Sequence, residues 1–169
     1  MASNNKKFLK EIAITLIAVV ATYVFFTYGL QVVLGTSVPV AVVESNSMYP
    51  TLKVGDIIIV KGVEPSQIRV GDIIVFSSKE VYPGITVVHR VIGIYYENGE
   101  YMFRTKGDNN LLPDPCCVLG NEVKGIVIYD IPYLGYVTIF FQSYPSSFVF
   151  LLLILVIVLA LIPTKRNKE

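Results

Sequence analysis

Residues 95–103 read YYENGEYMF, and this stretch contains the strongest secondary-structure signal in the chain. Asn98 and Gly99 separate two runs of alternating residues, and Asn-Gly is the pair preferred in two-residue type I′ turns because both positions need a positive φ. The stretch therefore predicts a β-hairpin, with Tyr96 opposite Tyr101 on its two strands.

The same hairpin predicts which residues face each other farther from the turn. An uninterrupted antiparallel ladder places Ile92 opposite Thr105 and His89 opposite Asp108. A β-bulge would change this pairing, because one extra residue shifts every partner beyond it. On the uninterrupted register, a carboxylate lies across from the only histidine in the chain.

Short runs rich in β-branched residues surround the hairpin and are separated by turn residues. In chain order they read VPVAVVE, GDIIIVK, GDIIVF, ITVVHRVIGIYY, EYMFRTK and EVKGIVIYD. No long amphipathic helical pattern lies between them. We therefore expect a mainly β protein, with a small antiparallel β-sheet domain over residues 36–146.

Two apolar segments flank this domain. The chain has 169 residues, of which 53% are hydrophobic, and its mean hydropathy of +0.60 is higher than soluble domains usually show. Residues 12–34 carry no charge and at about 1.5 Å per residue span about 35 Å, so they predict a transmembrane helix that remains as an anchor. Residues 147–163 contain a shorter apolar run and predict a second transmembrane helix, with an interfacial helix as the alternative.

Basic residues cluster at both ends of the chain, in segments 1–11 and 164–169. The positive-inside rule places both segments in the cytoplasm, so the β domain lies on the extracytoplasmic side. Residues 36–147 hold eight basic and eleven acidic residues, a net charge of −3. This balance argues against a nucleic acid as partner, and the lipid bilayer is the expected environment of the two helices.

Residues 44–50 read ESNSMYP and follow the first predicted strand. Ser, Asn and Pro commonly end strands, so alone this stretch predicts an ordinary turn. A serine hydroxyl becomes a good nucleophile when a base removes its proton, and imidazole suits that task near neutral pH. A Ser-His mechanism in this chain must use His89, with Asp108 or Asp114 holding the imidazole. A buried histidine satisfied by a carboxylate for structural reasons is the alternative.

Three other side chains, Lys106, Cys116 and Cys117, are alternative catalytic groups. Lys106 could activate a serine if burial made its amine neutral. Cys116 or Cys117 could serve a cysteine peptidase, although neither has an activating neighbour in the sequence beyond His89. With a single histidine, a zinc site of the usual Cys/His kind lacks ligands, and we expect neither a metal nor a cofactor.

Four stretches together resemble the conserved boxes of type I signal peptidases in order and spacing. They are SNSMYPTL (45–52), GDIIVF (71–76), VVHRVIGI (87–94) and TKGDNN (105–110). In addition, IPYLGYVTIF (131–140) resembles the equivalent stretch of the archaeal enzymes and of the catalytic subunit of the eukaryotic endoplasmic-reticulum signal peptidase. The resemblance extends from about residue 40 to residue 141.

The resemblance implies a membrane-bound serine endopeptidase that removes signal peptides from secretory preproteins after small residues. Ser47 matches the nucleophile, and His89 stands where bacterial relatives have a lysine base. Asp114 matches the acid of a Ser-His-Asp triad, and Asp108 matches a second, supporting carboxylate. Ser45 fits a hydroxyl donor that joins the Ser47 main-chain N–H in an oxyanion hole. The hairpin register, in contrast, favours Asp108 as the partner of His89.

The strand before Ser47 is the expected substrate-binding edge, where Val42 and Val43 would meet an extended peptide by strand addition. Expected partners are secretory signal peptides, the bilayer and accessory membrane subunits. The expected location is an archaeal plasma membrane, with the endoplasmic-reticulum membrane as the alternative. A membrane-anchored β adaptor, or an inactive homologue that binds secretory chains without cutting them, is the competing function.

Overall fold

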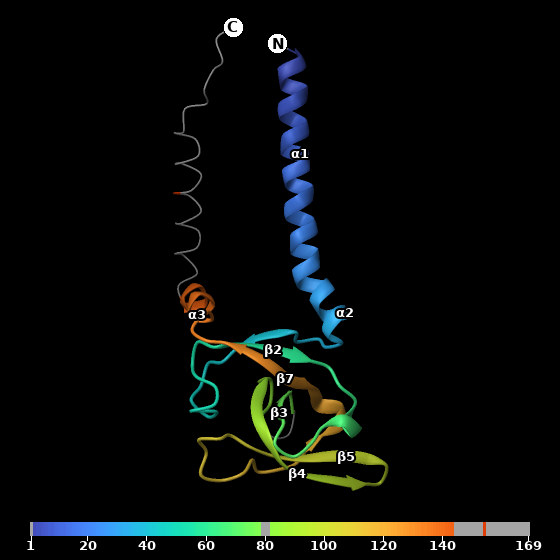
Figure 1. Cartoon of the computed structure of the whole chain (residues 1–169), viewed down its shortest axis with the longest axis vertical. Coiled ribbons are helices and arrows are strands. Elements are labelled where there is room, and N and C mark those ends of the chain that lie inside the picture. The colour runs from blue at the N-terminus through green and yellow to red at the C-terminus, as the bar shows by residue number, and fades with distance from the viewer. Residues whose placement is uncertain (1, 79–81, 144–153, 155–169) are drawn as a thin grey trace.

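A computed structural model describes residues 2–78, 82–143 and 154. A β domain lies at one end, and a long helical segment leads away from it to the N-terminus (Figure 1). This segment consists of three successive elements: α1 (Ala2–Val24), the π-helix η1 (Phe25–Gly29) and α2 (Leu30–Leu34). Gly35 ends it in the left-handed conformation, with a φ of 63° that glycine adopts at little cost.

The predicted membrane segments have different outcomes. Residues 12–34 fall within α1, η1 and α2. In the part of the chain that the structure describes, no helix combines the length and the apolar character needed to cross a membrane. The second predicted span, 147–163, lies outside the described residues apart from Ile154.

One antiparallel sheet of seven strands forms the domain, in the order β1-β2-β7-β3-β4-β5-β6. The strands are β1 (Val40–Val42), β2 (Ile57–Lys61), β3 (Ile73–Phe76), β4 (Val87–Glu97), β5 (Glu100–Lys106), β6 (Val118–Leu119) and β7 (Val123–Ile131). Short helices η2 (Pro65–Gln67) and η3 (Gly120–Glu122) lie in the connections, and α3 (Tyr136–Ser143) follows β7. The prediction of a mainly β, antiparallel domain is confirmed.

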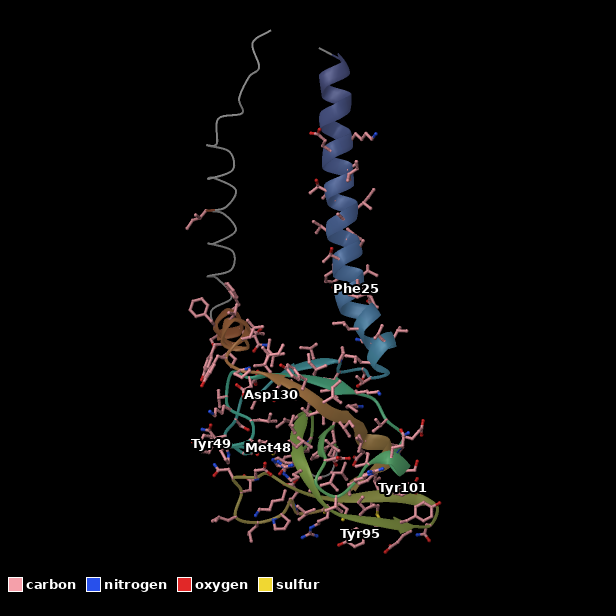
Figure 2. The ribbon with its side chains drawn as sticks, viewed as in Figure 1. Phe25, Met48, Tyr49, Tyr95, Tyr101 and Asp130 are labelled. Carbon is pink, nitrogen blue, oxygen red and sulfur yellow. The ribbon has the colours of Figure 1, made fainter. Side chains whose placement is uncertain are left out.

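The β4–β5 hairpin has the predicted turn. Asn98 and Gly99 have φ values of 53° and 86°, and Tyr96 lies opposite Tyr101. The rings of these two tyrosines are 4.7 Å apart between centroids, a contact that stabilises cross-strand pairs. Figure 2 shows Tyr95 and Tyr101 towards this end of the hairpin.

Farther from the turn, a bulge interrupts the ladder between Val91 and Gly93. Thr105 consequently lies opposite Val91 and not opposite Ile92. The prediction that Asp108 faces His89 across the hairpin is therefore wrong, because the extra residue in β4 shifts all partners beyond it.

Buried side chains form two clusters, and β3 contributes to both. Val75 belongs to the first cluster, whereas Ile74 and Phe76 belong to the second, as expected for a strand whose residues alternate between two faces. The first cluster contains Val43, Met48, Leu52, Ile58, Val60 and Val75, and the second contains Ile68, Ile74, Phe76, Val91, Phe103 and Val118. The core thus lies on both sides of the central strands.

Candidate active site

The turn that carries Ser47 is attached to the loop after β5. The main-chain N–H of Asn109 donates to the Ser47 carbonyl oxygen at 2.8 Å, and Asn109 Nδ2 donates to the carbonyl oxygen of Asn46 at 3.1 Å. Met48 is 1% exposed and anchors the turn in the core, whereas the neighbouring Tyr49 is half exposed (Figure 2). Ser47 is therefore held between a buried methionine and a hydrogen-bonded loop.

Gly107 permits this close contact. A Cβ atom at Gly107 would lie 2.6 Å from the Ser47 carbonyl oxygen, a separation that would force one of the two segments to move. The absence of a side chain lets the loop that contains Asp108 pack directly against the Ser47 turn.

The hydroxyls of Ser45 and Ser47 lie side by side, with 3.2 Å between the two Oγ atoms, and both residues are accessible to solvent. They border a cleft of about 280 Å³. Val42 and Val43 line one side of it, and residues 85–88, at the start of β4, also contribute.

His89 and Asp114 form a buried pair. His89 is 3% exposed and Asp114 is 2% exposed, and His89 Nδ1 lies 2.7 Å from Asp114 Oδ2. An ionised carboxylate can only accept a hydrogen bond, so Nδ1 carries the proton and Nε2 is left as the acceptor. This is the tautomer that a general base needs, with Nε2 free to take a proton from a hydroxyl.

Two further donors satisfy the Asp114 carboxylate. Thr105 Oγ1 donates to Oδ2 at 2.7 Å, and Tyr82 Oη donates to Oδ1 at 2.9 Å. Burial opposes ionisation of Asp114, but the hydrogen bonds from His89, Thr105 and Tyr82 outweigh it, and the pKa of Asp114 lies below its ordinary value. The carboxylate is therefore charged at neutral pH.

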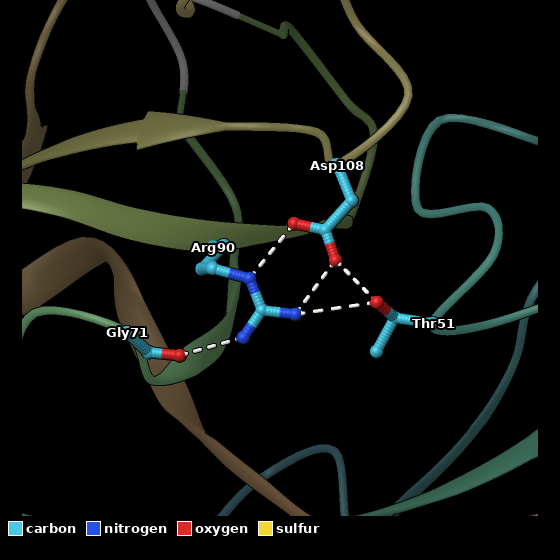
Figure 3. Close-up of polar contacts among 4 residues, drawn as sticks. All are labelled: Thr51, Gly71, Arg90 and Asp108. Carbon is cyan, nitrogen blue, oxygen red and sulfur yellow. Dashed lines mark hydrogen bonds and ion pairs between the residues drawn. The ribbon is translucent and has the colours of Figure 1, made fainter.

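Asp108 belongs to a different cluster, shown in Figure 3. Arg90 Nε and Nη2 donate to its two carboxylate oxygens at 2.8 and 2.6 Å, and Thr51 Oγ1 donates to Oδ2 at 2.6 Å. Arg90 Nη1 also donates to the Gly71 carbonyl oxygen at 2.8 Å. The hydrogen bonds from Arg90 lower the pKa of Asp108, although burial partly opposes them. The bidentate Arg90–Asp108 pair joins β4 to the loop after β5. Thr51 connects the segment that follows Ser47 to this pair.

The structure brings the residues implied by the resemblance into three groups: Ser45 with Ser47, His89 with Asp114, and Asp108 with Arg90. Within the described residues, Ser47 Oγ has Ser45 Oγ as its hydrogen-bond partner, and no hydrogen bond joins Ser47 to His89. Catalytic hydrogen bonds often tighten only when substrate is bound, so this geometry does not argue against a Ser-His pair.

Sequence reasoning missed the side chains that support the carboxylates. Thr105 lies in the TKGDNN stretch, but its hydroxyl had no visible partner in the sequence. Tyr82 lies in a connection between strands without any motif, and only the folded chain brings it to Asp114. Thr51 follows the serine turn, and its link to Asp108 spans 57 residues.

The other reactive groups considered from the sequence are Lys106, Cys116 and Cys117. Cys116 and Cys117 are free thiols. Across residues 2–78, 82–143 and 154, no three or more His, Cys, Asp and Glu side chains gather in a way that could hold a metal ion. Lys106 lies opposite Arg90 in the ladder, whereas the buried carboxylate lies at His89.

Comparisons with known proteins agree with this arrangement. The family model described as signal peptidase, peptidase S26, matches residues 7–97, more than half of the chain. The chain belongs to the signal peptidase family. As a signal peptidase it is a serine endopeptidase.

Curated relatives match over most of the chain. The signal peptidase complex catalytic subunit SEC11C of Homo sapiens is 33% identical over 150 residues, which cover 84% of this signal peptidase and 77% of the relative. The signal peptidase complex catalytic subunit sec11 of Dictyostelium discoideum is 34% identical over 149 residues, covering 82% and 80%. The corresponding subunit of Colletotrichum graminicola is 34% identical over 125 residues, covering 69% and 72%.

These relatives are eukaryotic proteins, so they do not support the archaeal plasma membrane predicted from the sequence.

Proposed function

We propose that this signal peptidase cleaves its substrates with a triad of Ser47, His89 and Asp114. The observation that carries the proposal is the buried contact of 2.7 Å between His89 Nδ1 and Asp114 Oδ2. It fixes the histidine tautomer whose Nε2 can accept a proton. The chain has no other histidine, so this imidazole is the natural base for a serine nucleophile.

The chemistry follows from these roles. Nε2 of His89 takes the proton of the Ser47 hydroxyl as Oγ attacks the carbonyl carbon of the scissile bond. The imidazolium then gives this proton to the leaving amine, which leaves the signal peptide as an ester on Ser47. Water, deprotonated in turn by His89, hydrolyses the ester and regenerates the enzyme. Asp114 remains ionised throughout and stabilises the imidazolium.

The oxyanion is assigned to two donors beside the nucleophile. The Ser45 hydroxyl lies 3.2 Å from Ser47 Oγ and can turn towards an oxygen bound there. The Ser47 main-chain N–H is the second donor. Such donors stabilise negative charge as it develops in the transition state, and loss of one commonly costs about 100-fold or more in rate.

The substrate is proposed to bind as an extended strand beside Val42 and Val43. Both residues line the cleft next to Ser47. In addition, β1 is the first strand in the order of the sheet and pairs only with β2 among the described strands. An unpaired edge can accept a peptide by strand addition, and small side chains are the ones we expect the cleft to accept near the scissile bond.

We also propose that the N-terminal helical segment anchors the enzyme and that the β domain faces the extracytoplasmic side. Residues 12–34 carry no charge, and large apolar side chains such as Ile17 and Val32 are exposed on this segment. Figure 1 shows α2 and α3 at the same end of the domain. We expect the membrane to be that of the endoplasmic reticulum and the partners to include accessory membrane subunits. The relatives named as subunits of a signal peptidase complex support both expectations.

A cleavage assay tests the function. Membranes that carry the full chain or its Ser47→Ala variant are incubated with a model preprotein, and the new amino terminus is mapped by mass spectrometry. We expect cleavage after a small residue with the full chain and none with the variant. Binding of the preprotein without cleavage by either form would support the adaptor function instead.

A further inference from the structure

We propose that Tyr82 is a positioning residue of this active site, which holds both Asp114 and the imidazole of His89 in place. The inference rests on the proposed triad and adds to it a residue from the connection between β3 and β4. Two independent contacts carry it: a hydrogen bond to the carboxylate and a ring contact with the histidine.

The first contact satisfies the part of Asp114 that the histidine does not reach. Oδ2 accepts from both His89 and Thr105, whereas Oδ1 has the Tyr82 hydroxyl as its donor among the described residues. Asp114 is 2% exposed, so solvent offers little replacement. A buried carboxylate oxygen that loses its donor is costly and tends to rotate or to move towards a new partner. The Tyr82 hydroxyl therefore fixes the plane of the carboxylate that orients His89.

The second contact fixes the imidazole itself. The rings of Tyr82 and His89 lie edge to face, with centroids 6.2 Å apart and an angle of 81° between their planes. The centroid of the Phe76 ring lies 6.3 Å from that of the imidazole and 6.4 Å from that of the Tyr82 ring. Edge-to-face packing of this kind is favourable and limits ring rotation. The imidazole is thus held by one aromatic ring on β3 and by another on the β3–β4 connection.

The position of Tyr82 in the chain links the triad to the substrate cleft. Ile85 and Thr86 line the cleft, and the Ile85 N–H donates to the Tyr82 carbonyl oxygen at 3.2 Å. The hydroxyls of Ser77 and Thr86 lie 3.1 Å apart and join the two ends of the connection. A peptide bound in the cleft would touch Ile85 and Thr86, and Tyr82, three residues before Ile85, donates to the catalytic acid.

The hydrogen bond also has an electrostatic consequence. Burial and the hydrogen bond to Asp114 raise the pKa of Tyr82 to about 12, so the hydroxyl remains a donor at every working pH. Among the described residues, the charged groups that act on His89 are Asp114, in direct contact, and Asp108, whose charge is balanced by Arg90. Removal of the Tyr82 donor leaves one oxygen of a buried, charged carboxylate without that hydrogen bond.

Tyr82→Phe tests the proposal because it keeps the ring and removes only the hydroxyl. Tyr101→Phe is the matched control, since Tyr101 also packs in the second cluster but stacks on Phe103. We expect kcat to fall about tenfold in Tyr82→Phe with KM changed less than twofold, because the hydroxyl does not touch substrate. Tyr101→Phe should match the parent chain in both.

A second measurement does not depend on activity. His89 is the only histidine in the chain, so ¹⁵N labelling of histidine in the detergent-solubilised full chain reports on this ring alone. The spectrum of the parent chain should show the Nδ1-protonated tautomer, and in Tyr82→Phe the two ring-nitrogen signals should move towards those of a mixture of tautomers. A folded Tyr82→Phe variant with unchanged kcat and unchanged ring-nitrogen signals would overturn the inference.

The proposed triad is tested separately. Cleavage by Ser47→Ala at the parent rate would refute the triad, whatever Tyr82→Phe does. An inactive Ser47→Ala together with a fully normal Tyr82→Phe would leave the triad intact and refute only the role of Tyr82.

Discussion

The buried pair of His89 and Asp114 is the residue-scale feature on which the proposed chemistry depends. The carboxylate accepts three hydrogen bonds, and only one of them comes from the histidine. This arrangement gives Asp114 two tasks: it selects the imidazole tautomer, and it compensates the charge that His89 acquires during proton transfer.

We predict that Asp114→Asn lowers the cleavage rate by about 10³- to 10⁴-fold, because an amide in place of the carboxylate stabilises the wrong tautomer. Asp72→Asn is a suitable control, since the Asp72 carboxylate accepts a hydrogen bond from the Arg69 main-chain N–H and not from the histidine. Rates of preprotein cleavage in membranes provide the measurement. A rate in Asp114→Asn within tenfold of the parent chain would rule out this role.

Thr51 connects the serine turn to the Arg90–Asp108 pair. Its hydroxyl donates to Asp108 at 2.6 Å and accepts from Arg90 at 3.3 Å. We predict that Thr51→Val lowers kcat by about tenfold, since a lost hydrogen bond to a charged group is worth roughly 1.5 kcal/mol, and that Thr51→Ser restores most of it. Equal kcat in the valine and serine variants would show that the hydroxyl is dispensable.

At the scale of the elements, the bulge in β4 determines which carboxylate meets the histidine. The Asn-Gly turn was readable from the sequence because its chemistry is local, and Tyr96 faces Tyr101 as predicted. The bulge before Gly93 depends on contacts with neighbouring strands, so the sequence could not reveal it. The uninterrupted register therefore predicted Asp108 as the partner of His89, whereas the partner in the structure is Asp114.

The resemblance to signal peptidases was more informative about Asp114 than the hairpin register was. An ordered set of motifs retains information on tertiary contacts that strand periodicity lacks. The supporting residues remained hidden for the same physical reason. Tyr82 reaches Asp114 across 32 positions and Thr51 reaches Asp108 across 57, and no local pattern encodes such distances.

The close approach of two loops at Gly107 predicts a sharp effect of a small change. In Gly107→Ala the new Cβ would meet the Ser47 carbonyl oxygen at 2.6 Å, so either the serine turn or the loop that contains Gly107 must move. We expect a loss of stability of about 1–3 kcal/mol and a large loss of activity. Thermal unfolding and cleavage rates of the purified chain measure both.

Gly93→Ala is the matched control for that experiment. A Cβ at Gly93 would have its nearest neighbour at 3.5 Å, an ordinary contact. We expect Gly93→Ala to lose much less stability and activity than Gly107→Ala. Equal activity in the two variants would contradict the proposed packing of the loop on the serine turn.

At the scale of the whole molecule, the two carboxylates make stability depend on pH. Asp108 and Asp114 both have a pKa below the ordinary value in the folded chain. Their stabilisation is therefore fully present above the unfolded pKa of about 3.9 and is lost as pH falls through the lower folded values. We predict a marked decrease in the unfolding temperature below about pH 4.

Thermal unfolding of the full chain in detergent between pH 3 and pH 7 checks this prediction. Asp108→Asn should have a lower unfolding temperature at pH 7 and a weaker dependence on acid, because one of the two groups no longer titrates. An acid dependence identical to that of the parent chain would show that the Arg90–Asp108 pair does not contribute.

The arrangement of the molecule was predicted in part. The sequence predicted one antiparallel β domain, and the structure contains it. Strand order depends on which edges pair in space, so β7 between β2 and β3 could not be read from a linear pattern. The charge-free length of residues 12–34 predicted an anchor, and in the structure these residues lie in α1, η1 and α2.

The central claim is that Ser47 and His89 act as one catalytic unit. The most direct test compares the cleavage rates of Ser47→Ala, His89→Ala and the double variant under identical conditions, with Lys106→Ala as control. Residues that act together are strongly non-additive, so we predict that all three variants fall to the same background and that Lys106→Ala stays active. A His89→Ala variant that retains more than about one-tenth of the parent rate, or loss of activity in Lys106→Ala alone, would contradict the claim.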